Sequence, residues 1–394
     1  HHAIDPIDED IVYSAGFYGS ISRTDVGTGE STPIMPQVEE GADPLRGQWL
    51  AHFILSPHNG DVIYHGMNYV FRSTDRGDTW MRISPDLSAN DQDRLGDIQF
   101  QTITALAESP IRQGLLYAGT DDGYVWVMQN PEDGWTEITD GMHPGRFTSE
   151  IVASQYDEST VYVTQNGRRS DDFAPYLWRS TDYGQSWESL AANVPTGPVN
   201  ILREDPKNEN ILYVGTDVGV YVSLDRGDTW QAVANGMPST FVHDLVIHPR
   251  EDLMVAATHG QGMLAFDVRQ LQQLTPEIMA ADAHLFAPED GFLPPQGGGF
   301  GAQHQSAWMH VWLGDDSTGT IEIRDDAGDV VTRLEVGGFE GLHQVEWGLE
   351  PQSSAGGQGG GFFRRRNYVP AGTYTAVLQV NGIELSSTVT VGRR

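Results

Sequence analysis

The chain has 394 residues, of which 55 are acidic and 23 are basic, so its formal net charge at pH 7 is −32. This balance excludes nucleic acid and anionic membrane surfaces as partners, because no basic stripe exists to meet phosphate groups. No apolar run reaches membrane-spanning length, so membrane insertion is not predicted, and the absence of cysteine excludes disulfides and thiol chemistry.

Almost all of the positive charge comes from arginine, since Lys207 is the only lysine. An acidic, lysine-poor surface favours adaptation to high salt, where the repulsion between carboxylates is screened. The alternative is a GC-rich genome that favours arginine codons. A melting temperature that rises with salt concentration would separate these two interpretations.

Residues 1–275 divide into six similar units. His1–Pro6 followed by Ile11–Tyr13 aligns with His52–Pro57 followed by Val62–Tyr64. This pattern of strand, proline turn and strand recurs twice more, and two weaker forms of it are also present. Short β-rich runs bounded by Gly, Pro, Asp and Asn predict an all-β structure. Four-stranded units repeated around an axis form a β-propeller, so we predict six visible blades.

A second motif marks the third turn of each unit. It is clearest in Phe71–Trp80, Trp178–Trp187 and Tyr221–Trp230, and fainter copies surround Asp25, Asp133 and Asp267. Its Asp can accept hydrogen bonds from turn amides, its Gly supplies backbone freedom, and its Trp is predicted to wedge between blades. The structural residues predicted for these turns are Asp75, Gly77, Trp80, Asp182, Gly184, Trp187, Asp225, Gly227 and Trp230.

The C-terminal part differs in composition. Leucine and isoleucine at helical spacing predict a helix over Val268–Met279 that caps the last unit, and residues 276–306 are predicted to hold this capping helix and a Gly/Pro-rich linker. Residues 307–394 contain six strand-like runs and are predicted to form a β-sandwich. The glycine tract at 352–367 carries Arg364–Arg366, for which a solvated loop is favoured over a docking site.

The three clear turn motifs are Asp boxes, and residues 1–275 resemble the BNR/Asp-box propellers of sialidases, sortilins and xyloglucan-degrading endoglucanases. Tyr69–Ser88, Ala257–Asp267 and Ala281–Pro288 resemble large bacterial proteins described as sortilin-like or BNR-repeat glycosyl hydrolases. Gly341–Glu350 and Val369–Gly382 resemble the Ig-like tail of flagellar hook-capping proteins. The resemblance implies structural, non-catalytic Asp boxes, and the sequence lacks the arginine motifs of a sialidase.

These similar proteins look longer than this chain and often carry a second propeller upstream. Since the sequence does not start with Met or a signal peptide, we interpret His1 as a processed or truncated end, with the remnant of a tag as the alternative. A seventh blade, completed by an upstream segment or by another chain, stays open as an alternative to six.

The face opposite the Asp boxes is predicted to carry the functional loops. Asp121 and Asp217 are weak catalytic candidates, because two carboxylates on one face can act as acid and base in glycoside hydrolysis. The predicted binding residues are Tyr18, Trp49, His52, Asp122, Arg146, Arg168 and His259. No metal-ligand spacing is present, so no cofactor is predicted, although oxygen-rich loops leave calcium open.

Two functions fit this sequence. The first is an exported, non-enzymatic binding or scaffold module that engages a protein or polysaccharide at the cell surface, and we favour it because no catalytic signature accompanies the fold. The alternative is a glycoside hydrolase that acts on an extracellular polysaccharide through paired carboxylates. Both interpretations predict an extracellular, periplasmic or cell-surface location.

Overall fold

A computed structural model describes residues 1–38, 41, 44–95, 100–194, 197–233, 237–295, 304–352 and 367–393. The chain divides into two compact units, His1–Val268 and Arg269–Arg394. The predicted docking or solvated loop at Arg364–Arg366 lies outside the described residues.

Six antiparallel sheets follow one another along the first unit, and each is a meander in which strands adjacent in sequence pair. We number these sheets blades 1 to 6. Blades 1 to 3 contain β1 (His2–Ile4), β2 (Ile11–Ala15), β3 (Ile21–Asp25), β4 (Ser31–Pro33), β5 (Phe53–Leu55), β6 (Ile63–Gly66), β7 (Val70–Ser73), β8 (Met81–Arg82), β9 (Ile103–Glu108), β10 (Leu116–Thr120), β11 (Val125–Met128) and β12 (Thr136–Glu137).

The remaining blades continue this pattern, and blade 6 has three strands within the described residues. Blades 4 to 6 contain β13 (Phe147–Ala153), β14 (Val161–Gly167), β15 (Asp172–Ser180), β16 (Glu188–Ser189), β17 (Val199–Glu204), β18 (Leu212–Thr216), β19 (Gly219–Ser223), β20 (Gln231–Ala232), β21 (Val242–His248), β22 (Leu253–Thr258) and β23 (Met263–Asp267). Three 3-10 turns lie between strands, namely η1 (Phe17–Gly19), η2 (Gln92–Arg94) and η3 (Arg168–Ser170).

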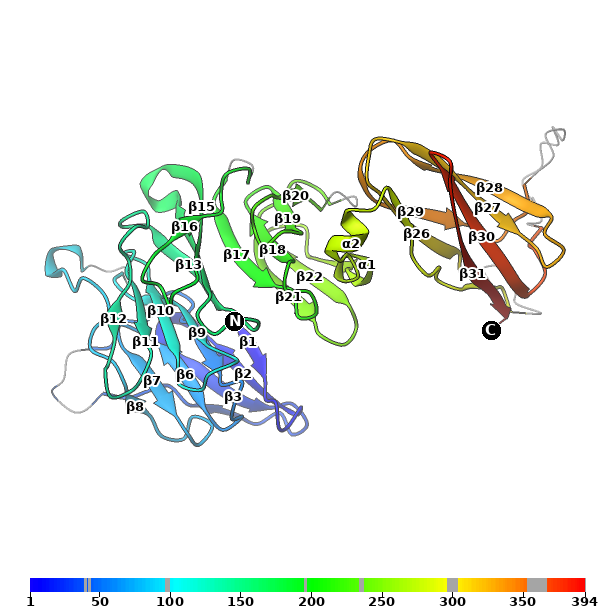
Figure 1. The fold of residues 1–394 in the computed structure, drawn as a ribbon. Helices are drawn as coiled ribbons and strands as arrows, with labels where there is room; N and C mark the ends of the chain where they lie inside the picture. The colour runs from blue at the N-terminus through cyan, green and yellow to red at the C-terminus, as the bar shows by residue number, and fades with distance from the viewer. Residues whose placement is uncertain are drawn as a thin grey trace. The chain divides into compact units, whose positions relative to one another are not determined.

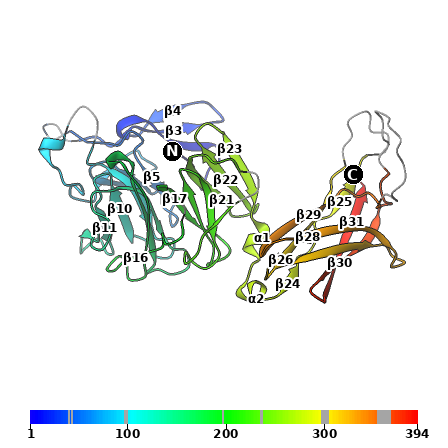
Figure 2. The same cartoon turned by 90° about the horizontal axis from the view of Figure 1, so that it is seen from above.

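The blades surround a common centre. The first strands of successive blades contact one another, as β5 contacts β9, β9 contacts β13, and β17 contacts both β13 and β21. In Figure 1, β9, β17 and β21 lie toward the middle of this unit while β8 and β12 lie farther out, and Figure 2 shows the same unit from above. The predicted all-β propeller with six blades is confirmed, and a seventh blade stays a prediction.

Apolar side chains between neighbouring blades form the core of the propeller. The second strands of blades 2, 3 and 5 are buried along their whole length, because each has a neighbouring blade on both faces. Tyr13, Phe53 and Ile63 form one such interface between blades 1 and 2, and all three are fully buried. Burial on both faces explains why these strands are almost continuously apolar.

Each Asp-box turn is closed by the same local contacts. In the box of blade 5, Ser223 Oγ donates to Asp225 Oδ1 at 2.7 Å, Thr229 N donates to the same oxygen at 2.8 Å, and Thr229 Oγ1 donates to Asp225 Oδ2 at 2.6 Å. Asp75 and Asp182 accept the corresponding bonds in blades 2 and 4. These hydrogen bonds lower the pKa of Asp75 and Asp182, chiefly through the hydroxyls of Thr79 and Ser186.

The box glycine and tryptophan join each turn to the preceding blade. Gly227 has a φ of 99°, a backbone angle that residues with a side chain rarely adopt. A Cβ at this position would lie 2.6 Å from Leu190 Cδ1. The Trp230 indole Nε1 donates to the Leu190 carbonyl at 3.0 Å, and the side chain is 5% exposed. Trp80, Trp135 and Trp187 donate in the same way to carbonyls of the preceding blade, and Gly77 and Gly184 likewise have positive φ.

The second unit begins with two short helices, α1 (Arg269–Gln272) and α2 (Pro276–Met279), in place of the single predicted helix over Val268–Met279. Pro276 has no backbone N–H, and Thr275 Oγ1 caps the second helix by accepting from Ile278 N at 3.3 Å. The chain therefore stops and restarts its helix at this point. The boundary of the propeller unit falls at Val268, whereas the sequence predicted residue 275.

The rest of this unit is a β-sandwich. One sheet has the order β24-β26-β29, and the other has the order β25-β31-β30-β27-β28. The strands are β24 (Ala283–Leu285), β25 (Gly291–Leu293), β26 (Ala307–Leu313), β27 (Thr318–Arg324), β28 (Val330–Gly337), β29 (Gly341–Trp347), β30 (Gly372–Val380) and β31 (Ile383–Arg393).

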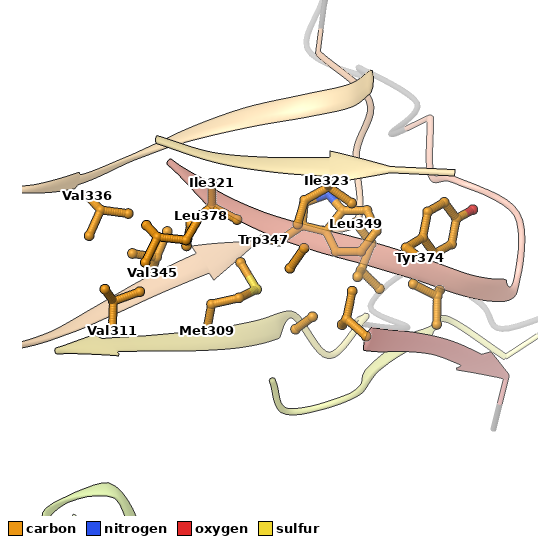
Figure 3. Close-up of a cluster of buried hydrophobic side chains, with 14 of the residues drawn as sticks. Met309, Val311, Ile321, Ile323, Val336, Val345, Trp347, Leu349, Tyr374 and Leu378 are labelled. Carbon is orange, nitrogen blue, oxygen red and sulfur yellow. The ribbon is translucent and has the colours of Figure 1, made fainter. Parts of the chain in front are cut away.

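Side chains from both sheets meet in the core of the sandwich (Figure 3). Met309 and Val311 come from the smaller sheet, Ile321 and Ile323 come from the larger one, and all four are fully buried. The resemblance of this unit to the Ig-like tail of hook-capping proteins stays a prediction.

Part of the predicted 276–306 linker belongs to this sandwich. β24 pairs with β26, and β25 pairs in parallel with the last strand, β31. Each of the two strands is three residues long and lies beside Pro- or Gly-rich sequence, which is why composition alone indicated a linker.

Candidate functional site

The candidate residues converge on one face because of the meander. In an antiparallel meander, the turns between strands one and two and between strands three and four lie at one end, and the loops between strands two and three lie at the other. The Asp boxes are turns between strands three and four. The loops at the opposite end, together with the segments that enter each inner strand, carry η1, Trp49, η3, Asp217 and Phe241.

Three aromatic side chains form an exposed platform on this face, made of Phe17, Tyr18 and Trp49. Their exposed fractions are 56%, 45% and 55%. The Phe17 and Trp49 ring centroids are 4.5 Å apart, and Tyr18 meets Trp49 edge-on at 5.5 Å. The structure thus brings together two predicted binding residues, Tyr18 and Trp49, and adds Phe17.

The backbone beneath the platform is held tightly. Tyr18 N donates to Gln48 O at 3.0 Å, and a Cβ on Gly47 would lie 2.5 Å from Tyr18 C, so only glycine permits this approach. Below it, His65 is fully buried and its Nε2 donates to Gly19 O at 2.8 Å. Burial lowers the pKa of His65 to about 4, so the ring is neutral at pH 7.

Gln48 connects the platform to the candidate carboxylate Asp121. Gln48 Oε1 accepts from Trp49 N at 2.8 Å, and Gln48 Nε2 donates to Asp121 Oδ2 at 2.9 Å. Asp121 also accepts from Thr102 N at 2.9 Å, and its side chain has no exposed surface. Burial raises the pKa of Asp121, although the Thr102 amide and Arg169 oppose this shift.

Two consecutive arginines in η3 join three blades. Arg169 Nη1 lies 3.3 Å from Asp121 Oδ2 in blade 3, and the Arg169 guanidinium carbon lies 4.9 Å from the Phe147 ring centre. Arg168 Nη2 donates to Asp217 Oδ1 in blade 5 at 2.6 Å, and its guanidinium carbon lies 4.5 Å from the Phe241 ring centre. Each arginine is therefore supported by one aromatic ring and one carboxylate.

Beside these arginines lies an open pocket of about 400 Å³. Its wall is built from blades 4, 5 and 6 and is lined by Phe147, Ser149, Asn166, Arg168, Arg169, Asn200, Phe241 and His243. Asn200 Nδ2 donates to Asp217 Oδ1 at 3.0 Å, so Arg168 and Asn200 both bind the same carboxylate oxygen. The Asp217 side chain is 23% exposed, so it remains accessible.

His243 and His259 form a contact at the edge of this pocket. His243 Nε2 lies 3.1 Å from His259 Nδ1, and the two rings are 5.3 Å apart. Burial lowers the pKa of His243, and the nearby His259 and Arg168 lower it further, while Asp217 and Asp244 raise it. The predicted binding residue His259 thus reaches the pocket through His243.

Arg203 sits deeper, among the inner strands. It bridges two carboxylates, with Nη1 3.1 Å from Glu150 Oε2 in blade 4 and Nη2 3.0 Å from Asp244 Oδ1 in blade 6. Burial raises the pKa of Glu150 and lowers that of the half-buried His52 to about 4, and Arg203 adds to the shift at His52. His52 packs against the His1 ring at 4.8 Å, away from the contacts of the platform and pocket.

Two further predicted binding residues have structural partners. Asp122 is 8% exposed and accepts from Thr120 Oγ1 at 2.5 Å and Ala89 N at 2.8 Å. Arg146 Nε donates to Asp172 Oδ2 at 2.9 Å, and the Tyr176 hydroxyl donates to the same oxygen. The hydrogen bond from Tyr176 is the largest cause of the lowered pKa of Asp172. Neither side chain lines the pocket.

Sequence reasoning missed Gln48, Asn200, Phe147 and Asp244. All four lie in or next to a segment that enters an inner strand, the position that the predicted binding residue Trp49 also occupies. Their shared place in the repeat was the available signal, whereas the partners of Gln48 and Asp244, which are Asp121 and Arg203, lie in other blades.

Within the described residues, no group of three or more His, Cys, Asp and Glu side chains is arranged to hold a metal ion, and calcium stays a prediction. The part of the chain that the structure describes also contains no helix long and apolar enough to span a bilayer.

Residues 177–190, which include the box of blade 4, match the family described as BNR-Asp box repeat. The first unit is therefore a β-propeller in which one Asp-box turn matches this repeat. Xyloglucanase Xgh74A of Acetivibrio thermocellus is 28% identical to this chain over 147 residues, which cover 33% of this chain and 17% of that protein. The oligoxyloglucan-reducing end-specific xyloglucanase of Emericella nidulans is 26% identical over 209 residues, which cover 38% of this chain and 26% of that protein.

Two solved structures share the fold at low identity. The GH74 xyloglucanase from Xanthomonas campestris has a TM-score of 0.51 at 18% identity, with 80% of this chain and 50% of that chain covered. PorZ, a bacterial surface component of the type-IX secretion system of Porphyromonas gingivalis, has a TM-score of 0.51 at 12% identity, with 98% and 58% covered. The chain thus spans about half the length of these structures and a smaller share of the curated relatives.

Proposed function

We propose that this chain is part of a glycoside hydrolase that acts on an extracellular polysaccharide, and that the propeller face opposite the Asp boxes binds the polysaccharide chain. The exposed platform of Phe17, Tyr18 and Trp49 carries this proposal. Large aromatic faces held rigidly at a protein surface offer an apolar surface for the C–H faces of sugar rings. The relatives named xyloglucanases support a xyloglucan-like substrate.

Glycoside hydrolysis needs two carboxyl groups on either side of the bond that breaks. Of the two candidates from the sequence, Asp217 fits better, because it is 23% exposed while the Asp121 side chain has no exposed surface. Asp244 is 43% exposed, and both it and Asp217 act on His243 electrostatically. We therefore assign acid and base chemistry to Asp217 and Asp244, and a supporting role to Asp121.

The comparisons favour this proposal over the non-enzymatic scaffold that the sequence analysis preferred. The curated relatives are named as hydrolases, and their similarity lies in sequence as well as in fold. A fold alone does not carry a function, so the sequence similarity is the stronger support.

Release of reducing sugar from a panel of polysaccharides that includes xyloglucan tests the proposal. We expect release from at least one polysaccharide and a loss of about a hundredfold or more in both Asp217→Asn and Asp244→Asn, because each variant lacks one reacting carboxyl group. Asp121→Asn should retain most of the rate. Full activity in Asp217→Asn would refute its assignment, and polysaccharide binding without any release would restore the scaffold interpretation.

We also propose that the protein acts outside the cytoplasm, since a polysaccharide cannot cross a membrane unaided. PorZ, which shares the fold, is itself named a bacterial surface component. Fractionation of cells that produce the native protein, followed by antibody detection, tests this. Detection only in the cytoplasmic fraction would overturn the location.

A further inference from the structure

The pocket beside η3 differs in charge from the rest of the molecule. The chain has 55 acidic and 23 basic residues, yet the eight residues that line this pocket include two arginines and no carboxylate. Asp121 and Asp217 pair with these arginines, but neither carboxylate lines the pocket.

The charged side chains of the wall are hydrogen-bond donors only. Arg168 and Arg169 have no acceptor atom, whereas the amides of Asn166 and Asn200 can each donate and accept. The Asn200 amide already accepts from Arg168 Nη2 at 2.9 Å and donates to Asp217 and to the Val242 carbonyl. A neutral sugar hydroxyl needs both a donor and an acceptor to be satisfied, whereas a carboxylate needs donors only. The wall therefore matches an anionic group better than a hydroxyl.

Arg169 is the more available of the two arginines. Its side chain is 52% exposed, and among the described residues it forms one ion pair, 3.3 Å long, from Nη1 to the buried Asp121. Phe147 supports one face of the guanidinium, which fixes its orientation without using its N–H groups. A planar guanidinium held in this way matches the two oxygens of a carboxylate.

We infer that this pocket binds the carboxylate of a uronic acid residue, so that the polysaccharide carries acidic sugars. The inference rests on the proposed function for the sugar chain and adds the chemistry of one subsite. Oxidation of a hexose at C6 replaces CH2OH with a carboxylate of similar size, so an acidic residue occupies the space of a neutral one. Arg169 then binds this carboxylate, while Phe17, Tyr18 and Trp49 bind the sugar rings.

Calorimetric titration of the full chain with three matched oligosaccharides tests the inference at one fixed ionic strength. The first is a neutral β-1,4-glucan oligosaccharide, the second carries one residue oxidised to glucuronate at C6, and the third carries one sulfate at the same position. We expect the glucuronate form to bind about tenfold or more tightly than the neutral form, as charged hydrogen bonds typically give. Arg169→Gln should remove this preference for the glucuronate form.

Two controls keep the result interpretable. Arg82 also lies over an aromatic ring, with its guanidinium carbon 4.7 Å from the Tyr69 centre, but it is outside the pocket, so Arg82→Gln should keep the preference. Arg169→Lys retains the charge without the planar fork and should keep only part of the preference. A thermal melt of each variant establishes that it is folded.

The outcomes separate the inference from the proposed function. Equal binding of the neutral and glucuronate forms would overturn the acidic subsite and leave the platform intact. Glucuronate binding that depends on Arg169, with no binding of the neutral form, would support the subsite and count against the platform. Sulfate binding as tight as glucuronate binding would overturn the assignment to a carboxylate, and no binding of any form would overturn both.

Discussion

The two ends of the propeller blades are built from different kinds of contact. In the Asp-box turns, Asp225 is bound by Ser223 and Thr229, which lie two and four residues away in sequence. On the opposite face, Arg169 meets Asp121 across 48 residues, and Arg168 meets Asp217 across 49. Local contacts repeat wherever the motif repeats, whereas the distant contacts occur once.

This difference separates stability from function in one fold. The turns join each blade to the preceding one, so changes there should lower the free energy of unfolding. The opposite face carries exposed aromatic rings and partly exposed charges, so changes there should alter binding more than stability. The following predictions test this division, in order of decreasing effect.

Trp230→Ala should have the largest effect. The side chain is 5% exposed and bonded to the preceding blade, so its removal leaves a cavity that we expect to cost about 3 to 5 kcal/mol in the free energy of unfolding. Trp49→Ala is the control on the other face, where 55% exposure predicts a cost below about 0.5 kcal/mol. Urea denaturation measures both, and equal costs would contradict the division.

His65 should make the protein sensitive to acid. In the unfolded chain His65 binds a proton below its ordinary pKa of 6.5, whereas in the folded chain it does so only below about pH 4. The free energy of unfolding therefore falls as the pH falls from 6.5 to about 4. Between these two pH values, the free energy of unfolding of the wild type should fall by on the order of 2 to 3 kcal/mol more than that of His65→Asn.

Denaturation curves at several pH values measure this loss, and His58→Asn is the matched control. The His58 ring makes a similar contact with a backbone oxygen, Ser109 O, at 2.8 Å, but its side chain is exposed. If wild type and His65→Asn lose stability in parallel, His65 is not the source. Because His65 holds Gly19, acid should also loosen the aromatic platform.

Asp225→Ala should have a smaller effect than Trp230→Ala in the same turn. It removes three hydrogen bonds from a partly exposed site, so we expect a cost of about 1 to 2 kcal/mol and unchanged polysaccharide binding. Asp326→Ala, at an exposed turn of the second unit, serves as a neutral control. Loss of binding in folded Asp225→Ala would show that the turns affect the opposite face.

Salt should have the smallest effect on stability. The net charge of −32 favours a melting temperature that rises between 0.01 M and 1 M KCl, because the screening length falls from about 30 Å to about 3 Å. Salt also weakens the ion pairs that many arginines form, as at Arg203, and this opposes the gain from screening. We therefore expect the melting temperature to rise by only a few degrees, which corresponds to about 1 kcal/mol in the free energy of unfolding. Calorimetry measures the melting temperature in KCl, with sucrose of equal osmolality as the control. If the melting temperature does not rise with KCl, codon usage would be the better explanation of the low lysine content.

The sequence by itself determined the propeller and its turns. The box pattern from Ser223 to Thr229 encodes contacts that span two to four residues, and the same contacts form in the boxes of blades 2 and 4. Periodic turns with apolar strands between them then require a repeat architecture. The six strand-like runs of residues 307–394 likewise matched strands, because their alternating pattern reflects burial on one face.

Only the tertiary structure decided the composition of the site. Asp121 and Asp217 are equivalent in sequence, since each follows a second strand, yet Asp121 is fully buried by Gln48 and Arg169 while Asp217 is accessible. This difference in exposure depends on which side chains of the neighbouring blades lie beside each carboxylate. Blade packing brings residues almost 50 positions apart into contact, and no local pattern records which of them will meet.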